Sequence, residues 1–226
     1  MFSHELKNTI GSFKNISQLI LDRLGNIQPE RLKLFIQELN KSALDAYFML
    51  DNLLLWSISQ IYRFDLRKEP VDLKTIIYDA ISPFEFEIEK KNLQIKTLFE
   101  PATIINIDRR LFNAVLRNLV SNALKFSPNN STLEIGSEER LIDKQKFIEI
   151  FVKDQGSGLS EKEINFIKNS EIVSSRQGTM GETGSGIGLK LVFKLVESHN
   201  GFVELESLKG SYTKVSIFIP DEINGY

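Results

Sequence analysis

The sequence predicts an α+β protein in which a two-helix hairpin precedes an α/β sandwich. Three observations carry this prediction: two long amphipathic helical patterns fill the first 64 residues, a proline follows a charged segment at position 70, and short strands are interspersed with helices after it. We therefore expect one unit over residues 1–68 and a second over 69–226. With 226 residues, 42% of them hydrophobic, the chain is long enough to bury a core.

The first helix of the hairpin is predicted over residues 2–24. Its apolar side chains recur every three or four positions along one side of a helix, at Phe2, Leu6, Ile10, Phe13, Ile16, Ile20 and Leu24. Gly25 and Asn26 are typical of a helix end, and Pro29 is typical of the first turn of a helix. The chain is therefore expected to reverse direction between these positions.

The second helix is predicted from Pro29 to near Phe64. One apolar stripe follows a heptad repeat and contains Leu32, Ile36, Leu39, Ala43, Ala46, Leu50, Leu53 and Ser57. A second stripe, at Leu44, Phe48 and Leu55, gives the helix more apolar surface than a two-helix hairpin can bury. We expect two hairpins to pair as a four-helix bundle in a homodimer. The alternative is that the second stripe packs against the chain's own C-terminal domain.

Beyond Pro70 the pattern predicts a mostly antiparallel sheet with helices packed on it. Helices are expected over about 72–90, over 108–126, within the Gly- and Ser-rich segment 155–185, and up to about His199. Strands are expected near 93–99, 103–107, 132–137 and 146–153, with two more before Pro220. His199, at a helix end, is expected to be a capping or surface residue. A long structureless stretch such as 170–185 is typical of a functional loop, for example a lid.

Composition excludes several classes of function. The formal charge is −2 and no long basic run occurs, so nucleic acid and acidic membrane surfaces are poor candidates for the main partner. The chain has no cysteine, which rules out disulfides, thiol catalysis and cysteine zinc sites, and its two distant histidines argue against a histidine metal site. No apolar run approaches the ~20 residues of a membrane span. We expect a soluble, cytoplasmic fragment, with any membrane contact made through a missing N-terminal sensor.

Three motifs suggest chemistry. In NLVSNALKFSP, the side chains of Asn118, Asn122 and Lys125 share one helix face, where an amide oxygen can bind Mg²⁺ and an ammonium can neutralise phosphate. The alternative is a solvated polar face. In DQGSGLS, Asp154 can accept a hydrogen bond from an exocyclic amine such as that of adenine, and Gly156 and Gly158 permit a close turn.

The third motif, GETGSGIGLKLV, leads directly into a helix. Gly184, Gly186 and Gly188 would expose backbone N–H groups and the positive end of the helix dipole to a phosphate. The spacing differs from that of the Rossmann fingerprint and of a Walker loop. Each motif is weak alone, since aspartate and glycine also make ordinary turns.

In this order, the motifs resemble those of the sensor histidine kinases of two-component systems. SHELKN at the start resembles the phosphoacceptor box, NLVSNALKFSP the asparagine box, and DQGSGLS and GSGIGL the two glycine boxes. The resemblance spans essentially the whole chain. It implies a dimerisation and phosphoacceptor hairpin followed by an ATP-binding domain with the Bergerat fold, with ATP and Mg²⁺ as cofactors and a response regulator receiver domain as partner.

The resemblance also implies a role for each matching residue. His4 would be the phosphoacceptor, and Glu5 would orient its imidazole and take up its proton. The nucleotide contacts would be Asn122 on Mg²⁺, Asn118 and Lys125 on phosphates, Asp154 on adenine, Gly156, Gly158, Gly184, Gly186 and Gly188 in the glycine turns, and Thr213 in the pocket wall. Asn8, one turn after His4, occupies the position linked to dephosphorylation of the regulator; the alternative is a plain solvent-facing amide.

The residues themselves agree with this role for His4, which lies opposite the centre of the apolar stripe on the first helix. An imidazole with an unperturbed pKa of about 6.5 is largely neutral, and so nucleophilic, near neutral pH. The chain departs from the family in having Thr9 where many members have proline, Tyr212 where a glycine is usual, and only Phe166 as a candidate for the phenylalanine box.

Two other functions remain open. One is a non-kinase ATPase of the same fold. Such enzymes resemble one another in having a glutamate that acts as a general base at the position that Asn118 occupies here. An amide cannot act as a general base, so this function is disfavoured. The other is a phosphotransfer scaffold with an inactive nucleotide domain, which the intact Asn122, Lys125 and Asp154 argue against.

Overall fold

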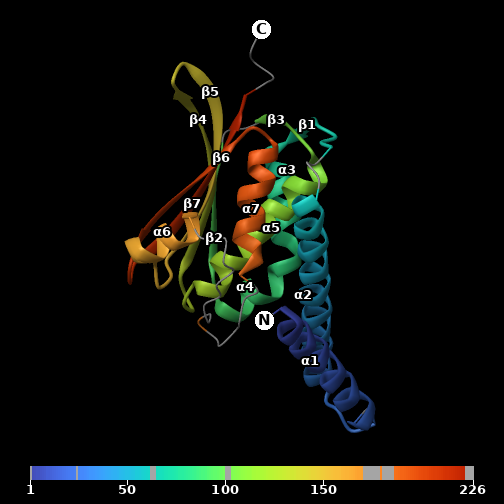
Figure 1. The fold of residues 1–226 in the computed structure, drawn as a ribbon. Helices are drawn as coiled ribbons and strands as arrows, with labels where there is room; N and C mark the ends of the chain where they lie inside the picture. Colours follow the sequence, from blue (N-terminus) through green and yellow to red (C-terminus); the bar gives the residue numbers. More distant parts are fainter. Residues whose placement is uncertain are drawn as a thin grey trace.

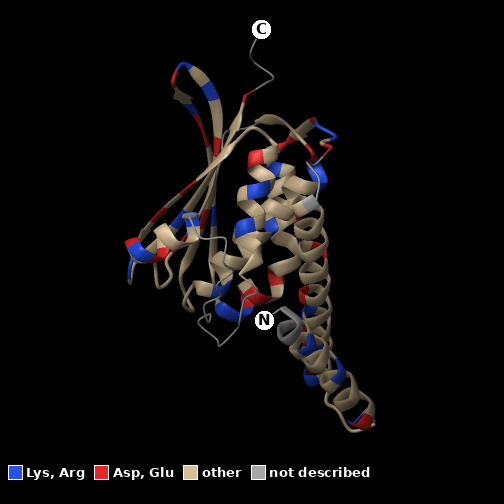
Figure 2. Ribbon diagram, viewed as in Figure 1, with Lys and Arg blue, Asp and Glu red and all other residues tan. Residues whose placement is uncertain are grey.

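A computed structural model describes residues 2–23, 25–61, 65–99, 103–169, 179 and 186–221, without the side chains of residues 2–5, 61 and 169. Figure 1 shows a long helical hairpin beside a domain in which helices cover one face of a twisted sheet. This arrangement confirms the α+β class. Acidic and basic residues are interspersed over both parts (Figure 2).

The hairpin consists of α1 (Phe2–Arg23) and α2 (Pro29–Ile61). In the turn between them, the N–H of Asn26 donates to the carbonyl of Arg23 at 2.8 Å. Pro29 begins α2, as predicted, because its ring fixes φ at a helical value and the first turn needs no N–H donor. Within the described residues, no helix is long and apolar enough to cross a bilayer.

The main sheet has five strands in the order β2-β4-β5-β7-β6. They are β2 (Gln94–Leu98), β4 (Thr132–Ile142), β5 (Gln145–Asp154), β6 (Phe202–Leu208) and β7 (Tyr212–Pro220). Only the β2–β4 pair among them is parallel, so the predicted, mostly antiparallel character is confirmed. β4 continues past its predicted end at 137 because Asp143 and Lys144, both at positive φ, form a tight turn into β5.

A second, two-stranded sheet was not predicted. β1 (Glu69–Asp72) pairs antiparallel with β3 (Ile104–Ile107). β1 is short and contains Pro70, which has no N–H to donate to a neighbouring strand and is therefore confined to edge positions. Its sequence consequently resembles a linker more than a strand.

Five helices belong to the sandwich in the described residues: α3 (Leu73–Ile81), α4 (Glu85–Lys91), α5 (Arg109–Phe126), α6 (Glu161–Asn169) and α7 (Ile187–Ser198). The single helix predicted over 72–90 is wrong, because a 3₁₀ turn at Ser82–Phe84 breaks it where Pro83 removes a backbone donor. α5 begins as predicted, because the side chain of Asp108 accepts from the N–H of Leu111. Its apolar face packs in one core with residues of α7 and the sheet.

The second apolar stripe of α2 packs against the chain's own C-terminal domain. Leu55 is 1% exposed and belongs to the same core as α5 and α7. The ring of Phe48 lies 5.9 Å, between centroids, from that of Phe84. The prediction that this stripe lies in a dimer interface is therefore wrong for these two residues, because the sandwich covers them. Ile36 and Leu50 of the heptad stripe remain exposed.

His199 ends α7, as predicted for a capping residue, but it is 1% exposed and so is not a surface residue. Its Nε2 accepts from the N–H of Asp108 at 3.1 Å, and its Nδ1 lies 2.7 Å from the carbonyl oxygen of Leu195. The ring also packs edge-on against Phe112, with centroids 5.9 Å apart. His199 therefore joins the end of α7 to the start of α5.

Replacing His199 by alanine is expected to lower the free energy of unfolding by about 3 kcal/mol, because it opens a cavity beside Phe112 and removes the acceptor of a buried N–H. Urea denaturation measures the change. Ser198→Ala, at the neighbouring position, is the control and should cost less than about 1 kcal/mol. Equal losses in the two variants would contradict the bridging role of His199.

Candidate functional site

A cavity of about 750 Å³ lies between the hairpin, α5 and the sheet. Its volume is within the range of small-molecule sites. Residues from all three sequence motifs line it, namely Asn118, Asn122, Lys125, Asp154, Gly158, Gly186 and Gly188, and Thr213 lines it as well. The fold thus brings together residues that lie as much as 95 positions apart, from Asn118 to Thr213.

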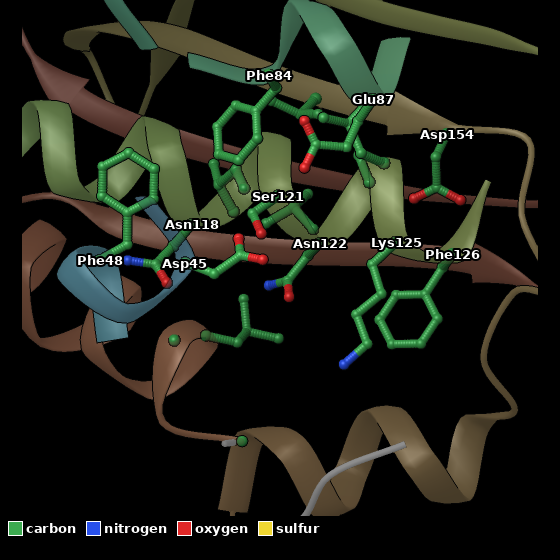
Figure 3. Close-up of a pocket in the computed structure, with 18 of the residues that line it drawn as sticks. Asp45, Phe48, Phe84, Glu87, Asn118, Ser121, Asn122, Lys125, Phe126 and Asp154 are labelled. Carbon is green, nitrogen blue, oxygen red and sulfur yellow. The ribbon is translucent and has the colours of Figure 1, made fainter. Parts of the chain in front are cut away.

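α5 presents its polar face to this cavity. The opposite face, with Leu116 and Val120, is buried in the core, and the buried Leu119 also reaches the cavity. In Figure 3, Asn122 and Lys125 extend from the helix into the space between α5 and the facing segments. A carboxamide and an ammonium one turn apart can bind a divalent cation and a phosphate together. This arrangement matches the predicted face.

Asp154 ends β5 at the wall of the cavity and is 6% exposed. Burial raises the pKa of Asp154 to about 6, although hydrogen bonds from the backbone N–H groups of Gly156 and Thr213 favour the ionised form. The N–H of Gly156 lies 2.8 Å from Oδ1. The sheet register places Thr213 opposite Asp154, which explains how these two residues, distant in the sequence, meet here.

Three glycines of the motifs are required by the protein's own packing. A Cβ at Gly156 would lie 2.5 Å from the carbonyl oxygen of Phe126. Gly158 has φ +60°, and a Cβ there would lie 2.1 Å from the carbonyl oxygen of Leu208. A Cβ at Gly188 would lie 2.4 Å from Oδ1 of Asn118. The sequence predicted close approach to a ligand, and that stays a prediction; the structure shows close approach to neighbouring protein segments at these positions. Gly186 is the N-cap of α7, and Gly184 lies outside the described residues.

Asn118 is paired with a residue that the sequence reasoning missed. Its Oδ1 accepts from Nδ2 of Asn52 on α2, and its Nδ2 donates to Oδ1 of Asn52, both at 2.9 Å. Its Nδ2 also donates to the carbonyl of Ala114 at 2.8 Å. A signal was available, since Asn52 interrupts the second apolar stripe between Phe48 and Leu55, and an amide in such a stripe needs a partner.

Charged pairs flank the Asn52–Asn118 pair and join α2 to the sandwich. Arg117 lies 2.7 Å from Asp51 and 4.7 Å from the centroid of the Phe48 ring. Lys41 bridges to Glu87 at 2.7 Å. Against the cost of burial, the carboxylates of Asp45 and Glu87 raise the pKa of Lys41, so the ammonium stays charged. Figure 3 shows Asp45 and Glu87 among the side chains that line the cavity, with Asp45 beside Asn118.

The N-terminal helix also reaches the cavity. Asn8, Thr9 and Ser12 of α1 line it, so the hairpin and the sandwich both contribute to one site. The side chains of His4 and Glu5 lie outside the described part of the chain, and their roles stay predictions. Phe166, the candidate for the phenylalanine box, is exposed on α6 at the cavity edge.

The described residues contain no group of three or more histidines, cysteines and acids that could hold a metal ion. A cation here would therefore depend on the carboxamide of Asn122 and on oxygen atoms of the bound ligand.

Residues 107–223 match the family model described as histidine kinase-, DNA gyrase B- and HSP90-like ATPase. The chain is 27% identical over 220 residues to the non-motile and phage-resistance protein of Caulobacter vibrioides, covering 96% of this chain and 26% of that protein. It is 24% identical over 219 residues to histidine protein kinase DivJ of the same species, covering 96% and 36%. The chain thus spans about a quarter to a third of these curated relatives.

Solved structures share the fold. Histidine kinase AdeS of Acinetobacter baumannii superposes with a TM-score of 0.65 over 97% of this chain and 98% of that chain, at 20% identity. Full-length ShkA in complex with AMPPNP superposes with a TM-score of 0.63 over 88% of this chain and 40% of that chain, at 18% identity. At these identities the likeness concerns the fold alone.

Proposed function

Because the chain belongs to the family of histidine kinase-, DNA gyrase B- and HSP90-like ATPases, we propose that it phosphorylates His4 with ATP and passes the phosphoryl group to an aspartate of a response regulator. The resemblance to histidine kinases that the motifs indicated is confirmed by this family match and by the kinase among its relatives. We further propose residues 1–68 as the dimerisation and phosphoacceptor unit and residues 69–226 as the ATP-binding unit.

One observation carries this proposal: α1 lines the same cavity as the three nucleotide motifs. Asn8 and Thr9 are cavity residues. Asn8 follows His4 by four positions, and residues four apart in an α-helix share a face. A phosphoacceptor at position 4 would accordingly lie on the side of the hairpin from which ATP is presented.

The site fits ATP and Mg²⁺. Asp154 would accept the exocyclic amine of adenine, and the cavity has the volume for a nucleotide. Lys125 and Asn118 would contact phosphate oxygens, and Asn122 would hold the cation through its amide oxygen. When bound, Mg²⁺ supplies neutralisation of the phosphate charge. The AMPPNP complex of ShkA, a protein of the same fold, supports nucleotide binding by this chain.

In the proposed reaction, a ring nitrogen of His4 attacks the terminal phosphorus of ATP. A P–N bond forms, the bond from phosphorus to the bridging oxygen breaks, and ADP leaves with the electron pair. Glu5 takes up the imidazole proton, and Asn118 exchanges its partner Asn52 for a phosphate oxygen. Asn8 would position a water molecule for dephosphorylation of the regulator. In-line placement and charge neutralisation supply the catalysis.

Dimerisation through the hairpin is part of the same proposal. The heptad stripe of α2 leaves Ile36 and Leu50 exposed, and Ile10 and Phe13 of α1 are exposed as well. Apolar residues spaced along two adjacent helices are the expected core of a four-helix bundle formed with a second hairpin.

Incubation with radiolabelled ATP and Mg²⁺ tests the reaction. We expect acid-labile, alkali-stable label on the protein, which is the behaviour of a phosphoryl group on histidine. His4→Ala should lose it completely, because the chain's other histidine, His199, is 1% exposed and does not line the cavity. Asn40→Ala, an exposed change on α2, is the control and should keep the label. Label that persists in His4→Ala would overturn the proposal. Release of free phosphate without labelled protein would instead support a non-kinase ATPase.

A further inference from the structure

Lys91, the last residue of α4, is buried at 3% exposure although it carries a charged group. Its Nζ donates to the carbonyl oxygen of Leu124 at 2.7 Å and to that of Ser127 at 3.3 Å, and it lies 3.5 Å from that of Lys125. It also donates to Oγ1 of Thr179 at 2.8 Å. Burying an ammonium is costly unless it is compensated. The compensation here comes from the end of α5.

The carbonyls at a helix C-terminus have no partner within the helix and carry the negative end of its dipole. Lys91 therefore caps α5 with a full positive charge at the helix end where cations are favoured. That last turn contains Lys125, and Asn122 lies one turn before it. Both are cavity residues, and Lys91 itself lines the same cavity.

Thr179 also makes hydrogen bonds to the carbonyl groups at the end of α5. Its backbone N–H donates to the carbonyl oxygen of Lys125 at 3.0 Å. Its Oγ1 lies 3.1 Å from the carbonyl oxygens of Lys125 and Ser127, as well as accepting from Lys91. The hydroxyl thus bridges the ammonium and the helix end. Thr179 is 53 positions beyond the end of α5, so only the tertiary fold unites these groups.

We propose that Lys91 is a positioning residue for the bound nucleotide: it fixes the last turn of α5, and with it the phosphate-contacting Lys125, and it does so jointly with Thr179. This inference rests on the nucleotide site proposed above. Without the ammonium, the carbonyls that end α5 lose their buried donor, and the turn that carries Lys125 loosens. Small displacements of a group that contacts phosphate have large effects on binding and catalysis.

A matched pair of variants at Thr179 isolates the shared contact. Thr179→Val keeps the backbone bond and the side-chain size but removes the hydroxyl, whereas Thr179→Ser keeps the hydroxyl. Thr179 is exposed, so both variants should fold. By calorimetry with ATP and Mg²⁺, we expect Thr179→Val to raise the Kd about fivefold and Thr179→Ser to leave it within about twofold. The melting temperature should fall slightly in Thr179→Val, which removes one partner of the buried ammonium, and should not change in Thr179→Ser.

Lys91→Met removes the charge while keeping an unbranched side chain. It is expected to raise the Kd for ATP about tenfold or more, and Lys91→Arg to restore part of the loss. Adding Thr179→Val to Lys91→Met should change the Kd by less than about twofold, because both act through one contact. If Lys91→Met fails to fold, the comparison of Thr179→Val with Thr179→Ser tests the inference by itself.

A purely structural role predicts a different result. The melting temperature of Lys91→Met would fall while the Kd for ATP stayed at the wild-type value, or the two substitutions would multiply in the double variant. Either outcome, or an unchanged Kd in Thr179→Val, overturns the inference while leaving the proposed function intact. Failure of the wild-type protein to bind ATP would instead refute the proposed function, and the inference with it.

Discussion

Replacing Asp154 by asparagine is expected to weaken ATP binding about a hundredfold and, at the same time, to stabilise the nucleotide-free protein at pH 8. Oδ1 of Asp154 accepts the N–H of Gly156, and the N–H of Thr213 also donates to the carboxylate, so every group around it is a donor as the ligand amine would be. In the variant, the amide oxygen would stay with Gly156 and the amide nitrogen would face the amine, so two donors would meet. We expect a loss of affinity of about a hundredfold, since a mispaired polar group in a buried site costs about 3 kcal/mol.

The gain in stability follows from the direction of the pKa shift. Burial raises the pKa of Asp154 from 3.8 to about 6, so the folded protein holds this proton more tightly than the unfolded chain does. The ionised carboxylate therefore opposes folding above about pH 6, and stability recovers as the pH falls from 6 towards 4. This cost is at most about 3 kcal/mol at pH 8, and a neutral amide removes it.

Urea denaturation across pH 5 to 8 and calorimetry with ATP at pH 8 test both parts. The stability gain of Asp154→Asn should be largest at pH 8 and fall to about half at pH 5. Asp143→Asn makes the same chemical change in the exposed β4–β5 turn and should alter neither quantity. If Asp154→Asn bound ATP with wild-type affinity, the carboxylate would not be the acceptor for the adenine amine.

Replacing Asn52 by alanine is expected to raise the affinity for ATP about tenfold. Both polar atoms of the Asn118 side chain are engaged by Asn52, so Asn118 can contact phosphate only after this pair opens. Two net hydrogen bonds of about 1 kcal/mol each oppose the change, and removing them shifts the population towards the binding-competent state. The same substitution weakens the attachment of α2 to α5 and should speed labelling of His4.

Calorimetry with ATP distinguishes two roles for Asn52: competing with the nucleotide for Asn118, or supporting the nucleotide site. Asn40→Ala, elsewhere on α2, should bind ATP as the wild type does. In an Asn118→Ala background the gain from Asn52→Ala should disappear, because the competed group is no longer present. A lower affinity in Asn52→Ala would mean that Asn52 supports the nucleotide site and would contradict the expected competition.

Local sequence patterns were sufficient for most of the helices and for several of the residues that line the cavity. The three-and-four spacing of apolar residues located α1 and α2, and Pro29 and Asp108 marked helix starts because both act within one turn of the chain. The polar face of α5, with Asn122 and Lys125, was readable for the same reason. The roles of His4 and Glu5 rest on the resemblance and on the proposed function.

The partners of these elements were decided only by the tertiary structure. The second stripe of α2 had to be covered, but its sequence does not state whether a second chain or the chain's own sandwich covers Leu55. The links between Asn52 and Asn118, Lys91 and Thr179, and Asp108 and His199 join residues 66, 88 and 91 positions apart. Periodicity and capping report interactions within a few residues, whereas these contacts depend on how whole elements pack, which sets where each buried polar group finds its partner.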